Sequence, residues 1–368
     1  MYYYDEFGKE FKDELSFHEY LEEIDERAKW IRIPSRSLSV LTVSGHEVLV
    51  PDMEGVDMKD LLADTKKHSG LLLQFPEGMY PLGKTAVSTL KDRARIKGTA
   101  LMDVKKSVLA DILNECLQVA KGDALLRISE GKVRGVLSGD EADYAIISMP
   151  KLFMVASAYI SGDRNGEFIY GYADHNMAQI TWKIVDQKMT KAYADLMEEH
   201  GKKPFGNLQT FIRIVSSDVG ASGANIFYSI LDGDFTIVLG EALRTKHRHK
   251  QGLEEFSENM ESIFQYYKQK LRDIGKLCDI RIRYPVNALS EVMKKQSFGK
   301  KRIVERFKTN FGEQPCSAYE IYCGLCEALF FARKSGSSPS NLVKMEEKIA
   351  RCMNVRWHDY DIPGEISL

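Results

Sequence analysis

The stretch EGMYPLGKTAV, residues 77–87, contains the residue types that bind phosphate in a nucleotide-binding loop. Gly78 is followed by four residues and then by Gly83, Lys84 and Thr85, which is the spacing of a P-loop. In such a loop the backbone N–H groups and the lysine bind phosphate oxygens, and the hydroxyl binds Mg²⁺. The spacing therefore predicts a nucleotide-binding site in an NTPase.

Two features of the same stretch argue against a phosphate-binding loop. Pro81 has no backbone N–H to donate, and Leu82 is bulky where the loop must wrap tightly. P-loop proteins also alternate strands and helices around a parallel sheet, whereas several links here are too short for parallel crossovers. The alternative is a turn that leads into a helix near Lys84. A P-loop NTPase stays an alternative, and we expect no cofactor.

Basic residues cluster at two places in the C-terminal part of the chain. The run RTKHRHK occupies residues 244–250, and the second cluster lies within residues 294–302. Clustered Lys and Arg bind nucleic-acid phosphates, and aromatic side chains nearby can stack on bases. The alternative is an ordinary solvated basic surface, or one that binds the acidic N-terminal helix. The candidate nucleic-acid-binding residues are Arg244, Lys246, His247, Arg248, His249, Lys250, Lys294, Lys295, Lys300, Lys301 and Arg302.

The other combinations of reactive side chains favour structural roles. His247 and His249 would share one face of a strand, but no second pair of ligands follows, so we expect no metal. The run DHN at residues 174–176 favours a turn, because nothing nominates a nucleophile beside it. Cys323 and Cys326 lie one helical turn apart, which favours buried thiols over a zinc site. We expect no catalytic residue, and the sequence favours a non-catalytic protein.

Charge is unevenly distributed, although the formal net charge is only −2. Residues 1–30 carry ten acids against four bases, a local net charge of −6. Residues 241–310 carry seventeen bases against nine acids, a local net charge of +8. Such asymmetry indicates a polyanionic partner, or self-assembly into a homo-oligomer. The alternative is two solvated helical surfaces of opposite sign.

Cysteine usage and hydropathy suggest a cytoplasmic protein. The six cysteines are sparse, and four of them fall between residues 316 and 352, which is no pattern for a disulfide framework. The start MYYYDEFGKE lacks the basic and apolar regions of an export signal. No run of 18 apolar residues is present, so we expect no membrane span.

Hydrophobic periodicity predicts an α+β protein with a mainly antiparallel sheet. An acidic amphipathic helix is expected over residues 11–29, with Phe11, Leu15, Tyr20 and Ile24 as its apolar stripe. Strands, hairpins and helices follow over residues 37–51, 70–75, 84–120, 123–138, 167–185, 210–240, 253–274 and 317–334. The predicted hairpin turns are residues 44–46 and Glu130-Gly131, and Ser317 and Glu320 have the spacing of a capping box. The run over residues 70–75 is a buried strand or a buried apolar turn, because its periodicity does not decide between them. The predicted units are an acidic helical segment (1–30), an α+β core with antiparallel hairpins (31–240), and a helical, basic region (241–368).

Five stretches resemble a family of uncharacterised proteins encoded by phages, plasmids and integrative elements. They are YPLGKTAVSTLKDRARI (80–96), LRISEGKVRGVLSGDEADY (126–144), IVSSDVGASGANIFYSI (214–230), LRTKHRHKQG (243–252) and PCSAYEIYCGLCEAL (315–329). The resemblance spans roughly residues 80–330 and includes no catalytic motif. It implies an origin in a mobile genetic element and carries no established activity.

These observations favour one function and leave two alternatives. The favoured function is non-catalytic binding to the backbone of DNA or RNA, in strand annealing, recombination or replication support. The first alternative is a protein-interaction factor, such as an inhibitor of a host defence system, whose uneven charge directs docking to a host protein. The second alternative is the P-loop NTPase.

Overall fold

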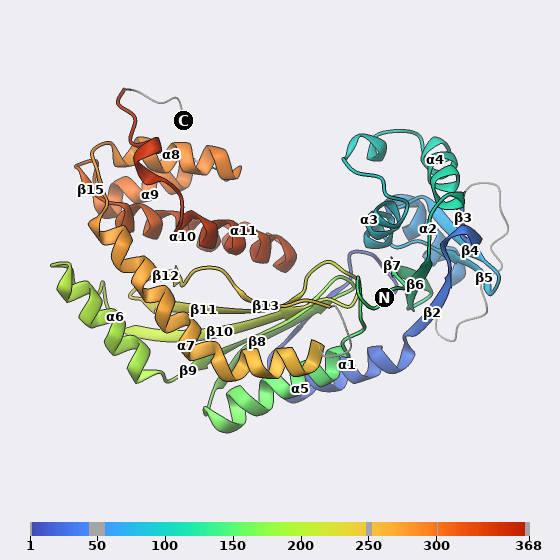
Figure 1. Ribbon diagram of the computed structural model, residues 1–368, viewed down its shortest axis with the longest axis horizontal. Coiled ribbons are helices and arrows are strands. Elements are labelled where there is room, and N and C mark those ends of the chain that lie inside the picture. Colours follow the sequence, from blue (N-terminus) through green and yellow to red (C-terminus); the bar gives the residue numbers. More distant parts are fainter. Residues whose placement is uncertain (1, 44–55, 248–251, 300, 365–368) are drawn as a thin grey trace.

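The computed structural model describes residues 2–43, 56–247, 252–299 and 301–364, which form two lobes (Figure 1). The core of the smaller lobe joins residues between Ile33 and Val136. The main core of the larger lobe joins residues from Phe11 to Leu21 with residues from Ile147 to Trp357. The chain therefore begins in the larger lobe, builds the smaller lobe, and returns.

These cores divide the chain differently from the predicted units 1–30, 31–240 and 241–368. Phe256 and Tyr267, which follow residue 240, share one core with Ile180 and Ile212, which precede it. The texture changes at residue 240 because strands give way to helices, not because a core ends. The sequence composition shows where strands give way to helices, but it does not show where a core ends.

A seven-stranded antiparallel sheet forms the centre of the larger lobe. Its strand order is β1-β8-β9-β10-β11-β12, and β13 also pairs with β11. This sheet confirms the predicted α+β class and the predicted antiparallel neighbours within residues 167–185 and 210–240. The strands are β1 (Gly8–Phe11), β8 (Glu167–Asp174), β9 (Ala178–Ile184), β10 (Leu208–Ser216), β11 (Ala224–Asp232), β12 (Phe235–Val238) and β13 (Leu243–Thr245).

Helices cover one face of this sheet, which we call the packed face (Figure 1). Side chains alternate along a strand, so Ile180 and Trp182 of β9 point into the core beneath these helices. A π-helical segment (Ala158–Asp163) directly follows the covering helix over residues 149–157. The covering helices are α1 (Glu14–Arg27), α5 (Met149–Ser157), α6 (Gln187–Glu199) and α7 (Gly252–Asp279).

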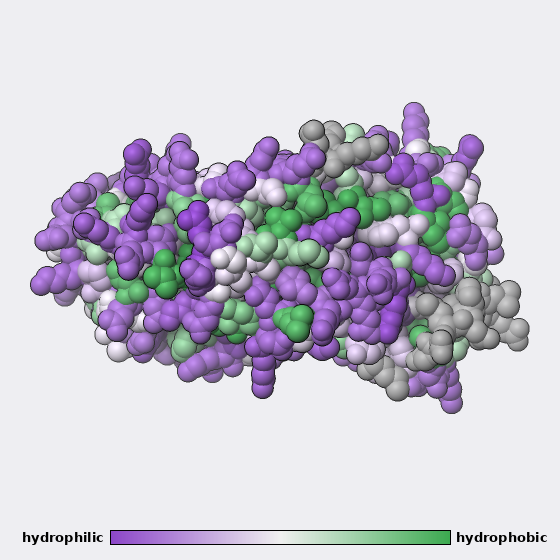
Figure 2. All heavy atoms as spheres, turned by 90° about the horizontal axis from the view of Figure 1, so that it is seen from below, coloured by the Kyte–Doolittle hydropathy of each residue, from purple (hydrophilic) through white to green (hydrophobic). Residues whose placement is uncertain are grey.

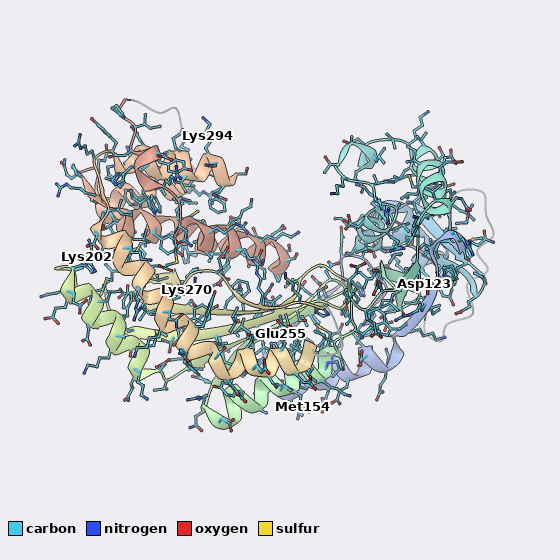
Figure 3. The ribbon with its side chains drawn as sticks, viewed as in Figure 1. Asp123, Met154, Lys202, Glu255, Lys270 and Lys294 are labelled. Atoms are coloured by element: carbon cyan, nitrogen blue, oxygen red, sulfur yellow. The ribbon has the colours of Figure 1, made fainter. Side chains whose placement is uncertain are left out.

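The outer surface of these helices is mostly hydrophilic, with apolar patches (Figure 2). Met154 of α5 is 51% exposed and lies on the side of its helix away from the sheet (Figure 3). Among the described residues, no helix combines the length and the apolar character needed to cross a membrane.

The acidic helix begins later than the sequence pattern predicts. Asp13 caps α1 by accepting a hydrogen bond from the Ser16 N–H, and Phe11 belongs to strand β1 instead. The helix buries Phe17, Tyr20 and Leu21, whereas Leu15 is 69% exposed. The predicted stripe was therefore wrong at Leu15, because it was phased from a residue outside the helix.

A group of four helices lies on the other side of the sheet, which we call the open face (Figure 1). Ser317 and Glu320 form the predicted capping box at the start of the helix over residues 318–334, which is largely buried. Burial raises the pKa of its Cys326 thiol to about 12, as expected for a structural cysteine. A short pair of strands, β14 (Arg281–Ile282) and β15 (Cys316–Ser317), and a 3₁₀ turn (Trp357–Tyr360) accompany the group. The helices are α8 (Pro285–Gln296), α9 (Lys301–Phe311), α10 (Ala318–Lys334) and α11 (Pro339–Cys352).

The described residues of the smaller lobe form two three-stranded sheets and three helices. The predicted hairpin over residues 123–138 is present, with Glu130 and Gly131 turning at φ of 49° and 75°. Residues 44–46, the predicted turn of the hairpin over 37–51, lie outside the described residues, and β3 pairs with β4. The strands are β2 (Lys29–Pro34), β3 (Ser39–Thr42), β4 (Leu71–Phe75), β5 (Gly78–Pro81), β6 (Asp123–Ser129) and β7 (Lys132–Ser138). The helices are α2 (Met58–His68), α3 (Lys84–Arg93) and α4 (Lys106–Gln118), with 3₁₀ turns at Ser35–Ser37 and Ala100–Met102.

Candidate nucleic-acid interface

The P-loop spelling falls on a strand end and a helix start. Gly78 begins β5, which pairs antiparallel with β4, and Gly83 caps α3. The Gly83 N–H donates to the Val133 carbonyl (2.9 Å), and the Lys84 N–H donates to the Asp5 carboxylate (2.9 Å). The Thr85 hydroxyl contacts Asn176. Because other groups of the protein occupy these donors, Gly78, Gly83, Lys84 and Thr85 form no phosphate cradle, and the turn-and-helix alternative describes the stretch.

A buried charge cluster, which consists of Asp5, Asp64, Lys132 and Arg134, surrounds this helix start. The Asp5 carboxylate lies 2.6 Å from Arg134 Nη1 and 3.2 Å from Lys132 Nζ, and Lys132 Nζ lies 2.5 Å from Asp64. Burial lowers the pKa of Arg134 to about 10. Burial alone would raise the pKa of Asp64, but hydrogen bonds from Lys132 and the Asp5 N–H outweigh it and hold that pKa below its ordinary value. The cluster ties the N-terminal segment to the smaller lobe.

The run at residues 244–250 splits between the surface and the interior. Arg244, on β13, lies 3.2 Å from Glu347 of α11, and Lys246 is exposed. His247 is buried, with its ring stacked on Tyr144 at a centroid distance of 5.5 Å. Burial lowers the pKa of His247 to about 4, so the ring is neutral at pH 7. His247 therefore lies beneath the surface on which Arg244 and Lys246 are exposed, and Arg248, His249 and Lys250 lie outside the described residues.

The second basic cluster lies where α8 ends and α9 begins. Lys294 and Lys295 are exposed in the last turn of α8, and Lys294 lies far from the sheet (Figure 3). Lys295 Nζ donates to the Tyr360 hydroxyl (2.8 Å). Lys301 and Arg302 are exposed in the first turn of α9, and Lys300 lies outside the described residues.

Helix α11 brings the two clusters onto one surface. Glu347 contacts Arg244 on one side, while the next residue, Lys348, donates to the carbonyl of Gln296 (2.9 Å) on the other. Helix α11 therefore lies between β13 and the end of α8 and contacts both. Lys344, Lys348 and Arg351 follow at helical spacing and share one face of α11. The α11 basic surface consists of Arg244, Lys246, Lys294, Lys295, Lys301, Arg302, Lys344, Lys348 and Arg351.

The contribution of α11 was not predicted from the sequence. Its basic residues are separated by Glu346, Glu347 and apolar residues, so no local run of positive charge is visible. Only the helical spacing of Lys344, Lys348 and Arg351 could have revealed them.

A groove of about 740 Å³ lies between the open face of the sheet and the helices α10 and α11. Tyr170 and Tyr172 of β8 and Phe211 of β10 line it and are half-buried. These strands were predicted from the sequence, but no role was assigned to their outward-facing side chains. The alternation in EFIYGYA, which places Tyr170 and Tyr172 on the same side, was the available signal.

A buried ion pair holds α11 against the open face. Arg213 of β10 contacts the Glu346 carboxylate and stacks on Phe227, with its guanidinium 4.8 Å from the ring centroid. Burial, together with the charge of Arg333, lowers the pKa of Arg213 to about 9. Met177, Val215, Phe227, Ala242 and Val343 form a small apolar cluster beside the pair.

Comparisons with known proteins do not place this chain in a family. No protein-family model, curated protein or solved structure matches it. Within the described ranges, no group of three or more His, Cys, Asp or Glu residues is arranged to hold a metal ion. The α11 basic surface and the groove are therefore the features of the described residues that bear on function.

Proposed function

We propose that this protein binds the phosphate backbone of nucleic acid through the α11 basic surface, without chemistry on the bound strand. The observation that carries the proposal is the contact of α11 with both basic clusters. Residues more than 40 positions apart thereby contribute nine cations to one surface. Lys and Arg that approach phosphates displace condensed counterions, which is the main source of such affinity.

The charge balance of the rest of the protein fits a local binding surface. The net charge is −2, so attraction to a polyanion has to come from this region rather than from the molecule as a whole. The resemblance to proteins of mobile elements favours annealing, recombination or replication support as the role, in the cytoplasm of a host cell. Binding of this kind would not depend strongly on sequence.

Reversing charge on this surface should abolish most of the binding. We expect the wild-type protein to bind a labelled oligonucleotide. A variant with four reversed charges should bind at least ~100-fold more weakly, because several phosphate contacts are lost together. Each lost contact should also lower the slope of log K against log salt by about 1. Fluorescence anisotropy measures both quantities. The variant combines Lys246→Glu, Lys294→Glu, Lys344→Glu and Arg351→Glu.

A control with the same net charge separates a local site from overall charge. It reverses four exposed lysines of the smaller lobe: Lys66, Lys97, Lys105 and Lys121. The control should keep most of the affinity, within about threefold at ~150 mM salt, because exposed charges beyond the Debye length are screened. Equal losses in both variants would contradict a site on the α11 basic surface.

A further inference from the structure

We propose that the groove on the open face stacks and hydrogen-bonds the bases of a single-stranded nucleic acid. This inference rests on the proposed function and adds to it the strand form and the base contacts. The groove meets the basic surface at α11, which lies over the open face (Figure 1) and contributes Leu342 and Glu346 to the lining.

The register of the sheet places the aromatic residues and the cations on one face. Tyr172 lies opposite Gln179, Gln179 opposite Val215, Val215 opposite Asn225, and Asn225 opposite Arg244. Residues directly opposite one another share a face, so Arg244 of the basic surface and Tyr172 of the groove belong to one row. A strand whose phosphates follow the basic surface can therefore direct its bases onto this sheet.

The groove exposes aromatic side chains. On a sheet face in water such side chains are normally covered by other elements, or polar residues stand in their place. Tyr170, Tyr172 and Phe211 are half-buried in the hollow, and Ile169 beside them is 44% exposed. Apolar surface collected in a hollow of this size marks a binding site. Flat rings on a sheet are stacking platforms for unpaired bases, since every base presents a π-face.

Two buried polar atoms in the groove have no hydrogen-bond partner among the described residues. They are the Gln179 side-chain oxygen and the Arg213 Nε, in residues that are 5% and 8% exposed. A buried polar group without a partner costs free energy, so a ligand that supplies one is favoured. Gln179 needs a donor and Arg213 an acceptor, and the edge of a nucleobase carries both. A duplex hides the Watson–Crick edges and the ring faces of its bases, which only an unpaired strand can present, so the groove selects a single strand.

The experiment compares three probes of about 20 nucleotides, a length near the site sizes of single-strand binders. They are oligo-dT, a duplex, and an abasic deoxyribose-phosphate chain that keeps the phosphates but has no bases. The wild-type protein should bind oligo-dT at least ~10-fold more tightly than either of the others. Equal affinity for oligo-dT and the abasic chain would overturn base stacking while leaving backbone binding intact.

The groove variant is Tyr170→Leu/Tyr172→Leu, which keeps apolar packing and removes the ring faces. It should lose at least ~10-fold in affinity for oligo-dT, with unchanged affinity for the abasic chain and an unchanged salt slope. Gln179→Leu, a single change that nearly keeps the volume of the side chain, should weaken binding to oligo-dT and leave binding to the abasic chain unchanged. Tyr284→Ala, at an exposed tyrosine outside the groove, is the control and should bind like wild type. If the groove variants also bind like wild type while folded, the inference is overturned; if the wild type binds no probe, the proposed function fails with it.

Discussion

Replacing Asp5 with asparagine is expected to lower the free energy of unfolding by about 3–5 kcal/mol, the usual result of leaving a buried charge unpaired. The Arg134 guanidinium is 3% exposed, and Asp5 is its carboxylate partner at 2.6 Å. Asparagine keeps the size of the side chain but supplies no charge. Lys132 still has Asp64 as an ion-pair partner, so Arg134 is the cation that loses its carboxylate. Urea unfolding followed by circular dichroism measures the change.

The adjacent residue provides a matched control for Asp5. Glu6 is largely exposed, and its pair with Lys67 at 3.2 Å lies in solvent. Glu6→Gln should therefore change stability by less than about 1 kcal/mol. Equal stability of Asp5→Asn and Glu6→Gln at pH 7 would show that the charge cluster does not hold the N-terminal segment.

The charge cluster should also make stability depend on pH. Because the pKa of Asp64 is lowered in the folded protein, the stability that this carboxylate contributes is present above its ordinary pKa and is lost as acid brings the pH below it.

Removing the Glu346 carboxylate should have a second large effect, on the docking of α11. Glu346→Ala leaves Arg213 buried on the sheet without its closest anion, and we expect a loss of about 3–5 kcal/mol. Since α11 carries the centre of the basic surface, its displacement should weaken nucleic-acid binding as well. Thermal unfolding and oligonucleotide binding on the same sample test both consequences.

The next residue along α11 separates burial from charge. Glu347→Ala removes the same charge, but its partner Arg244 is 45% exposed, so the expected loss of stability is below about 1 kcal/mol. The double variant Arg213→Met/Glu346→Leu should recover most of the stability, because apolar residues can replace a buried ion pair. Equal losses from Glu346→Ala and Glu347→Ala, or no recovery in the double variant, would contradict the role of the pair.

Local patterns were sufficient for most of the fold. The hairpin at Glu130-Gly131 and the capping box at Ser317 depend on residues close together in sequence, and both were predicted. The strand over residues 71–75 could not be separated from a buried turn, because apolar runs carry no periodicity when both faces are covered. The two-lobe division was missed because β1 and α1 share a core with strands more than 130 residues away.

The candidate site was only partly predictable. Basic runs located Arg244, Lys246 and the cluster around Lys294, since charge density is a local property of the sequence. The run itself gave no sign that His247 is buried, because its burial depends on Tyr144 and Ser216 from other elements. The union of the two clusters requires α11, which only the folded chain places between them.

The salt dependence of binding by the wild-type protein tests the central claim most directly. A fluorescent single strand should be titrated with the protein at several salt concentrations between ~50 and ~200 mM. If about six of the nine cations contact phosphates, log K should fall with log salt at a slope of about −4 for a single strand. Binding that is absent at the lowest salt, or that does not change with salt, would contradict a phosphate-binding surface at α11.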